Sequence, residues 1–288
     1  MIIISGSASP KLSKRVADEL KCRVKTPEVK RFPDGEVYVK IDGELKGEEV
    51  AVVQSTCNPQ DSNYMELFLL LDVAKDLGAK KVTAVVPYFG YARQDSRFKN
   101  GEAVSVQTIR KLLEAAGADE VITIDAHKAA TMDLFEISAR SLSAMPALGA
   151  HLKTLKLKNT VILAPDKGAL HHAEMVAKEL GADCDYLQKT RKSATEVVME
   201  TKDLDVKGRD VAIVDDIIST GGTIVQAIGV LKSQEAGKIY AGCVHPVLVG
   251  DALKKIMDAG AEAVFSTDTI EHEISTVSVS PIIADALR

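Results

Sequence analysis

Short runs of β-branched and other apolar residues alternate along the chain with longer amphipathic stretches. The short runs are typical of strands buried on both faces, as in parallel sheets, and the longer stretches have the spacing of helices that cover a sheet. The expected strands include residues 50–53, 82–86, 121–124, 161–163, 211–214 and 239–244. The expected helices include residues 65–77, 104–116 and 223–233. This alternation predicts a doubly wound α/β fold, in which ligands bind at the carboxyl ends of the strands.

Parts of this pattern occur twice. Residues 46–53 are echoed by residues 207–214, and residues 116–121 by residues 259–264. Two copies of one α/β unit explain these echoes, with the first copy lengthened around residues 88–97. The alternative is that glycine-containing turns before strands recur by chance. We therefore expect two domains, residues 1–143 and 144–288, in a chain whose 288 residues are long for a single core.

Composition narrows the function classes. The formal net charge of −5 argues against a general nucleic-acid or membrane-surface binder, but a small anion can still bind where positive groups are clustered. The four cysteines form no C-x-x-C pair, so they predict neither a metal finger nor a disulfide framework. The apolar N-terminus is too short for a signal sequence, and no apolar run has the length of a membrane span. We expect a cytoplasmic protein.

The strongest chemical pattern is residues 211–223, where a buried strand leads into acids, hydroxyls and glycines and then into a helix. Backbone N–H groups beside glycines and at a helix N-terminus bind anions, and hydroxyls add donors. The residues concerned are Asp215, Asp216, Ser219, Thr220, Gly221, Gly222 and Thr223. We expect a phosphomonoester in the loop and sugar hydroxyls on the two carboxylates, which accept hydrogen bonds. The chain has no Walker A motif, and the plainer alternative is an ordinary capped helix.

The thirteen residues 211–223 resemble the phosphoribosyl-pyrophosphate-binding motif of the type I phosphoribosyltransferase fold. The resemblance implies two tandem duplicated phosphoribosyltransferase-like domains, each a mainly parallel sheet flanked by helices. In the first copy, residues 54–59 read QSTCNP where the loop should be. We expect that copy to have lost its pocket, which leaves one sugar-phosphate site in each chain.

Further segments, in order along the whole chain, are similar to those of ribose-phosphate diphosphokinases. They are residues 31–36, 87–95, 125–127 and 164–169, followed by the loop after residue 214. The resemblance implies transfer of the β,γ-diphosphoryl group of Mg·ATP to the 1-hydroxyl of ribose 5-phosphate, giving phosphoribosyl pyrophosphate and AMP for nucleotide biosynthesis. A phosphoribosyltransferase that uses a nucleobase and a non-catalytic regulatory homologue remain the alternatives.

The resemblance also implies roles for individual residues. It implies an ATP site made of Phe32, Asp34, Glu36, Arg93, Gln94, Asp95 and His127. It implies a pyrophosphate loop made of Asp166, Lys167, Gly168 and Ala169, with His127 and Asp166 near Mg²⁺. Lys189 and Arg191, on a loop that closes over the triphosphate, are the implied catalytic residues. Read without the family, residues 32–36 are a turn, residues 93–95 a solvated loop, His127 a hydrogen-bonded histidine and residues 189–192 a solvated charge run.

Two segments depart from the bacterial pattern of this family. Residues 192–195 read KSAT instead of a proline-containing segment, and residues 166–169 lack a double glycine. The neighbouring pair His171 and His172 is interpreted as structural. The family places the ATP site between chains, which implies at least a dimer, and packs the last helix, residues 282–287, on the first domain.

Overall fold

The protein, described here by a computed structural model, forms two compact units. The structure describes residues 1–288 except 98, 192–196 and 201–203, and for residues 189–191 and 197–200 it describes the backbone alone. The first unit contains Met1–Ser143, Thr269–Glu271 and Ser278–Arg288. The second contains Ala144–Asp268 and His272–Val277.

The first unit is built on a six-stranded parallel sheet with the order β2-β1-β5-β6-β7-β8. Its strands are β1 (Ile2–Ser5), β2 (Arg23–Lys25), β5 (Glu49–Val53), β6 (Lys81–Val86), β7 (Glu120–Ile124) and β8 (Ser138–Leu142). The 3-10 helix η1 (Ala129–Leu134) precedes β8. All residues of β1 and β7 are buried, as expected for strands covered on both faces.

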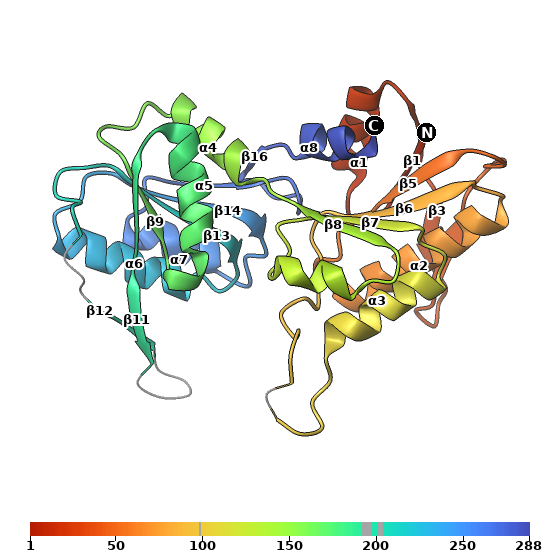
Figure 1. Ribbon diagram of the computed structural model, residues 1–288, viewed down its shortest axis with the longest axis horizontal. Helices are drawn as coiled ribbons and strands as arrows, with labels where there is room; N and C mark the ends of the chain where they lie inside the picture. The colour runs from red at the N-terminus through yellow and green to blue at the C-terminus, as the bar shows by residue number, and fades with distance from the viewer. Residues whose placement is uncertain (98, 192–196, 201–203) are drawn as a thin grey trace. The chain divides into compact units, whose positions relative to one another are not determined.

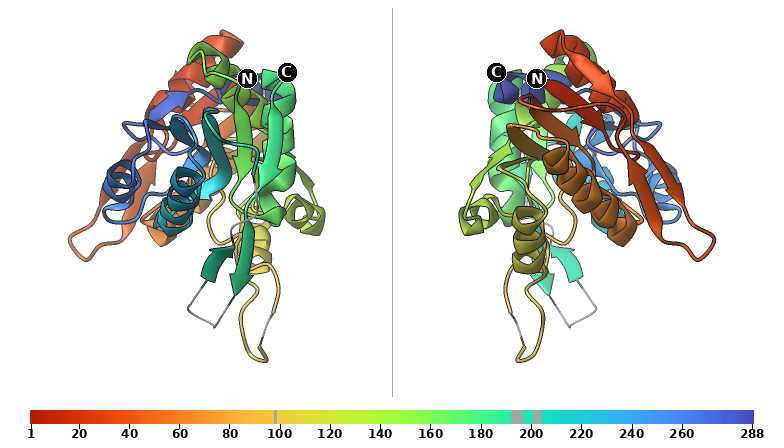
Figure 2. Two further views of the ribbon diagram at one scale, coloured as in Figure 1. Left: turned by 90° about the vertical axis from the view of Figure 1, so that its left-hand side faces the viewer. Right: turned by 90° about the vertical axis from the view of Figure 1, so that its right-hand side faces the viewer.

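Helices cover both faces of this sheet. One face carries α1 (Pro10–Leu20) and the C-terminal helix α8 (Ser280–Leu287), which contact each other, and the other carries α2 (Gln60–Asp76) and α3 (Ser105–Ala115) (Figure 1). A core of buried leucine, valine and isoleucine side chains fills the space between the sheet and α2 and α3. The side views show the same layers (Figure 2).

The second unit repeats this plan. Its parallel sheet has the order β10-β9-β13-β14-β15-β16, which matches the first sheet strand for strand. The strands are β9 (Val161–Ala164), β10 (Asp183–Tyr186), β13 (Val211–Ile218), β14 (Ile239–Pro246), β15 (Ala263–Thr267) and β16 (Ser275–Val277). The helices are α4 (Met145–Thr154), α5 (Leu170–Leu180, after the 3-10 turn η2, Lys167–Ala169), α6 (Gly222–Ser233) and α7 (Ala252–Ala259). The expected fold class, two tandem sheets of this kind flanked by helices, is confirmed.

Each unit adds an antiparallel hairpin after the second strand of its sheet in sequence. In the first unit the hairpin pairs β3 (Glu28–Arg31) with β4 (Val37–Lys40), and in the second it pairs β11 (Gln188–Arg191) with β12 (Val197–Glu200). The β11–β12 hairpin extends away from its own sheet in both Figures 1 and 2. The duplication therefore includes the hairpins, which the sequence echoes did not reveal.

Two expected boundaries were wrong. The strand expected at residues 211–214 continues to Ile218 as β13, because β14 pairs with it as far as Pro246. Asp215 and Asp216 therefore lie within a strand rather than after one. The helix expected from residue 65 begins at Gln60, directly after Pro59.

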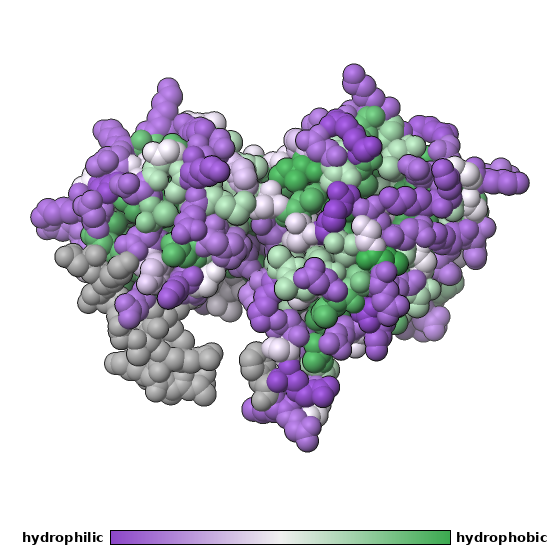
Figure 3. All heavy atoms as spheres, in the orientation of Figure 1, coloured by the Kyte–Doolittle hydropathy of each residue, from purple (hydrophilic) through white to green (hydrophobic). Residues whose placement is uncertain are grey.

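The surface is polar over most of the face in Figure 3, with apolar groups scattered between charged ones. Among the described residues, no helix is both long and apolar enough to cross a membrane. Phe32, at the β3–β4 turn, is one of the large apolar side chains left exposed, at 45%.

Candidate active site

The loop between β13 and α6 has the geometry of an anion site. Gly221, the N-cap of α6, has a φ of 77°, a left-handed conformation that favours glycine. A Cβ on Gly221 would also lie 3.2 Å from the carbonyl oxygen of Ala252. A Cβ on the exposed Gly222 would have no heavy atom nearer than 3.9 Å. The first glycine is therefore required by the fold, whereas the second keeps open the space in front of the helix.

The amides at the start of α6 face that space. The first bond of the helix runs from the amide of Val225 to the carbonyl oxygen of Gly221, at 2.9 Å, so the amides of Gly222, Thr223 and Ile224 come before any intrahelical bond. No described side chain caps the helix. Three N–H groups with the positive end of the helix dipole behind them favour a negatively charged group here.

Asp215 and Asp216 precede the loop, and both are partly buried. Burial raises the pKa of Asp215 well above its usual range, and the negative charges of Asp216 and Asp166 raise it further. The amide of Asp216 donates to Oδ1 of Asp215 at 3.0 Å, which opposes part of this shift. The second unit therefore gathers three carboxylates beside the anion loop, and bringing them together costs free energy unless a cation or hydroxyl donors are bound.

Asp166 belongs to the turn between β9 and α5. Its Oδ1 accepts hydrogen bonds from the amides of Gly168 at 2.9 Å and Ala169 at 3.2 Å, so its side chain caps the η2 turn. The ring Nδ1 of His171 lies 3.1 Å from the carbonyl oxygen of Gly168, while Lys167 and Gly168 are exposed. Two amides of the expected pyrophosphate loop thus already have an acceptor within the chain.

The residues expected at the ATP site lie in the first unit, on the β3–β4 turn and on two loops that an ion pair joins. Asp95 follows β6 and Lys128 follows β7, and their side chains form a salt bridge. The hydrogen bond from Lys128 lowers the pKa of Asp95, which keeps the carboxylate charged. Arg93 and His127 are exposed close by in sequence. Lys128 was not among the residues expected from the sequence, although it directly follows the expected residue His127.

The turn Phe32–Glu36 joins β3 to β4, as expected. The amide of Phe32 donates to the carbonyl oxygen of Glu36 at 2.9 Å, and Gly35 has a φ of 97°. Asp34 accepts from the amide of Glu36 at 3.2 Å. The ring of Phe32 meets Tyr38 edge to face at 5.7 Å, and Phe32 remains 45% exposed.

The remaining expected residues are only partly described. Lys189 and Arg191 lie in β11, opposite Met199 and Val197 of β12, and residues 192–195, where the sequence departs from the bacterial pattern, fall outside the described residues. Within the described part of the chain, no three His, Cys, Asp or Glu side chains form a ready metal cluster. The expected pairing of His127 with Asp166 joins residues of different units.

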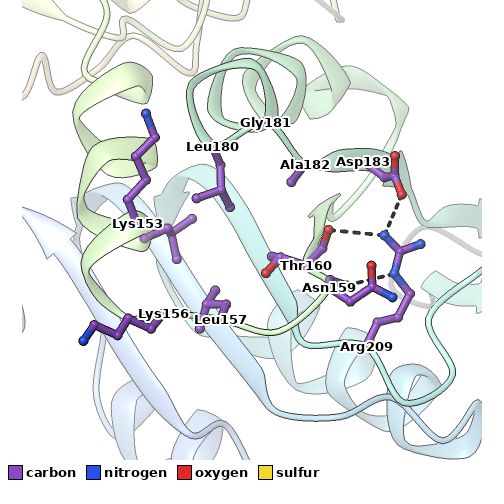
Figure 4. Close-up of a pocket in the computed structure, with 11 residues that line it drawn as sticks. Lys153, Lys156, Leu157, Asn159, Thr160, Leu180, Gly181, Ala182, Asp183 and Arg209 are labelled. Carbon is purple, nitrogen blue, oxygen red and sulfur yellow. Dashed lines mark hydrogen bonds and ion pairs between the residues drawn. The ribbon is translucent and has the colours of Figure 1, made fainter.

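A separate pocket of about 380 Å³ lies at the opposite, amino-terminal edge of the second sheet (Figure 4). The pocket contains Arg209, a residue type that commonly binds anions. The guanidinium of Arg209 is already bonded to acceptors within the chain. Its guanidinium donates to the carbonyl oxygens of Asn159 and Thr160 and pairs with Asp183 at 2.5 Å and Asp205 at 2.9 Å. Arg209 therefore ties together the segment before β9, the first residue of β10 and the segment before β13, which is a structural role.

Comparison with known proteins agrees with the fold and identifies the family. Family profiles match residues 1–117 as the N-terminal domain of ribose phosphate pyrophosphokinase and residues 134–280 as a phosphoribosyl transferase domain. The chain is 51% identical to the ribose-phosphate pyrophosphokinase of Methanothermobacter thermautotrophicus and 39% identical to that of Saccharolobus solfataricus, each over the whole of both chains. It resembles the crystal structure of phosphoribosylpyrophosphate synthetase from Mycobacterium smegmatis with a TM-score of 0.90 and 29% identity, over 100% of this chain and 97% of that one.

Proposed function

We propose the reaction of this chain from the family to which it belongs, the ribose-phosphate pyrophosphokinases. In our proposal the chain transfers the β,γ-diphosphoryl group of Mg·ATP to the 1-hydroxyl of ribose 5-phosphate. The products are 5-phosphoribosyl 1-pyrophosphate, which serves nucleotide biosynthesis, and AMP. The observation that carries the proposal is the uncapped start of α6 beside Asp215 and Asp216. That arrangement suits a phosphorylated sugar that also presents hydroxyl groups.

Ribose 5-phosphate binds in the second unit in this proposal. Its phosphate accepts hydrogen bonds from the loop Ser219–Thr223, where three amides precede the first bond of α6. Its 2- and 3-hydroxyls donate to Asp215 and Asp216. These donors offset the repulsion and desolvation that raise the pKa of Asp215 in the unliganded chain. The 1-hydroxyl then faces the diphosphoryl donor.

The first unit binds ATP in this proposal. Phe32 offers an exposed ring for the adenine, and Asp34 and Glu36 flank it at a turn whose backbone is fixed by hydrogen bonds. The salt bridge between Asp95 and Lys128 joins the two loops that carry the other expected ATP ligands, Arg93, Gln94 and His127. Because the family builds this site between chains, we propose at least a dimer, with sedimentation as its test.

Mg²⁺ is the cofactor in this proposal, and the acidic residues of the second unit carry the type of oxygen that it prefers, although the described side chains do not form a ready cluster of three ligands. Asp166, Asp215 and Asp216 offer hard carboxylate oxygens, and the pKa of Asp215 is raised chiefly by burial and further by the negative charges of Asp216 and Asp166. Asp166 uses one oxygen for the amides of Gly168 and Ala169. In this proposal Asp166 and His127 would hold the ion. Bound Mg²⁺ would reduce the negative charge of the phosphates that approach these carboxylates.

The transfer needs positioning and charge neutralisation rather than covalent help. The 1-hydroxyl oxygen forms a bond to the β-phosphorus, the bond from that phosphorus to the oxygen shared with the α-phosphate breaks, and the hydroxyl proton is lost to solvent. The β11–β12 hairpin carries Lys189 and Arg191, which with Arg93 neutralise charge as the transition state forms. We assign no general base.

Product analysis tests the reaction directly. Incubation with Mg·ATP and ribose 5-phosphate should give AMP and phosphoribosyl pyrophosphate in equal amounts, followed by phosphorus NMR. Ribose without its phosphate is the control and should give no AMP above background. Formation of ADP, or no nucleotide turnover, would contradict the proposal. We also propose a cytoplasmic location, in which the four free cysteines stay reduced.

A further inference from the structure

The matched strand orders identify the part of the first unit that corresponds to the anion site of the second. β1 corresponds to β9 and β5 to β13, so the turn after β1 takes the place of the Asp166 loop. By the same match, residues 54–59 take the place of the phosphate loop. These two segments of the first unit contact each other. Side chains of the same unit occupy the space beside them that corresponds to the ligand site of the second unit.

Glu66, on α2, fills the turn after β1. Its Oε1 accepts a hydrogen bond from the amide of Ser7 at 2.7 Å, and its Oε2 accepts one from the hydroxyl of Ser7 at 2.5 Å. Glu66 is only 4% exposed, and within the described part of the chain no cation forms a salt bridge with it. A buried carboxylate held by one amide and one hydroxyl has the contacts expected of a bound anion rather than of an ion pair.

Gln54 completes the same cluster. Its Oε1 accepts from the amide of Ala8 at 2.9 Å, and its side chain packs so closely on Gly6 that a Cβ there would lie 2.2 Å from it. Gln54 is fully buried, yet its Nε2 has no acceptor among the described residues. Burying a donor without an acceptor costs folding free energy. This Nε2 group adds one more donor to a cluster that already contains several.

We propose that this cluster is an oxyanion site that the chain fills from within, with the Glu66 carboxylate in the place of a ligand. Removing that carboxylate should leave a cavity that takes a small external carboxylate such as formate. In the native chain Glu66 occupies this cluster and keeps external anions out of it. If the proposed function holds, this closure explains why a sugar phosphate has one binding place per chain, but the cluster stands independently of that reaction.

Anion rescue tests the inference. Glu66→Ala should melt at least about 5 °C below the native chain in sodium chloride, and replacing the chloride with about 100 mM formate should raise its midpoint by about 3 °C. Glu66→Gln is the matched control, because its amide fills the cavity and keeps one acceptor oxygen. The control and the native chain should show the same change in melting midpoint between the two salts. Comparing Glu66→Ala with them therefore removes any effect of formate that binds in the second unit.

Equal formate shifts in all three proteins would overturn the inference. If Glu66→Ala does not fold in chloride, its refolding yield is compared in the two salts, and a yield restored by formate supports the inference. An equal failure in both salts overturns it. Because the readout is stability rather than turnover, a negative result here leaves the proposed reaction to its own test.

Discussion

The backbone amide of Gly168 donates a hydrogen bond to the carboxylate of Asp166 across 2.9 Å, and Ala169 donates to the same oxygen. This places the side chain of Asp166 on amides that the proposed reaction also needs for pyrophosphate. Asp166 therefore has two separable properties, its shape as a cap and its negative charge.

Two substitutions of Asp166 separate these properties. Asp166→Asn keeps an oxygen for the two amides, so its stability should match that of the native chain, whereas turnover should fall at least about 100-fold because the charge is lost. Asp166→Ala removes the cap and should also lose about 1 kcal/mol of unfolding free energy. Urea unfolding and steady-state assays measure both. Near-native turnover of the asparagine variant would contradict a role for the charge.

The two glycines of the anion loop should respond differently to alanine. Gly221→Ala should destabilise the protein by about 1–2 kcal/mol, because Gly221 has a φ of 77°. Gly222→Ala should fold normally, since a Cβ there meets no atom within 3.9 Å, but it should raise the KM for ribose 5-phosphate at least about 10-fold. An unchanged KM for Gly222→Ala would place the sugar phosphate elsewhere.

Asp215 should make the unliganded protein less stable as pH rises. Its pKa is higher in the folded chain than in the unfolded chain, chiefly through burial, so the folded state binds more protons between the two values. Stability from this group is present below the unfolded pKa, about 4, and is lost as pH rises through the raised folded pKa. Asp215→Asn should therefore melt a few degrees higher at pH 7.5 and show less of this decline.

The same Asp215→Asn variant should bind ribose 5-phosphate more weakly, which calorimetric titration would measure. A gain in stability together with a loss of affinity is the expected signature of a strained binding residue. A lower melting temperature at pH 7.5 would mean that the carboxylate stabilises the free protein, contrary to the direction of its pKa shift.

Phe32 should matter for ATP but not for folding. Its side chain is 45% exposed, so Phe32→Ala should change the unfolding free energy by less than about 0.5 kcal/mol while raising the KM for ATP about 10-fold. Leu112→Ala, at a helical position that is 44% exposed, is the control and should leave that KM unchanged. Equal effects of the two substitutions would argue against adenine stacking.

Lys189→Ala should lower kcat at least about 100-fold with little change in the affinity for either substrate. The expectation follows from charge that develops only in the transition state. Gln188→Ala, on the same strand β11, provides a neutral control. A proportional loss of affinity and turnover for Lys189→Ala would indicate ordinary substrate binding instead.

Local sequence identified much of the site. The acids, hydroxyls and glycines of residues 211–223 predicted an anion loop, because glycine conformation and helix ends follow from nearby residues alone. The prediction of a turn at residues 32–36 was correct for the same reason. The echo between residues 46–53 and 207–214 likewise indicated duplication before any strand order was known.

The sequence by itself thus determined the repeated α/β plan and the chemistry of one loop. Only the tertiary structure decided that β13 continues through Asp215 and Asp216, because its length depends on pairing with the distant β14. Only the tertiary structure placed Glu66 on the amide and hydroxyl of Ser7, because that contact depends on how α2 packs against the sheet. Short-range conformation is encoded by neighbouring residues, whereas such pairings are decided by surfaces that meet after the chain has folded.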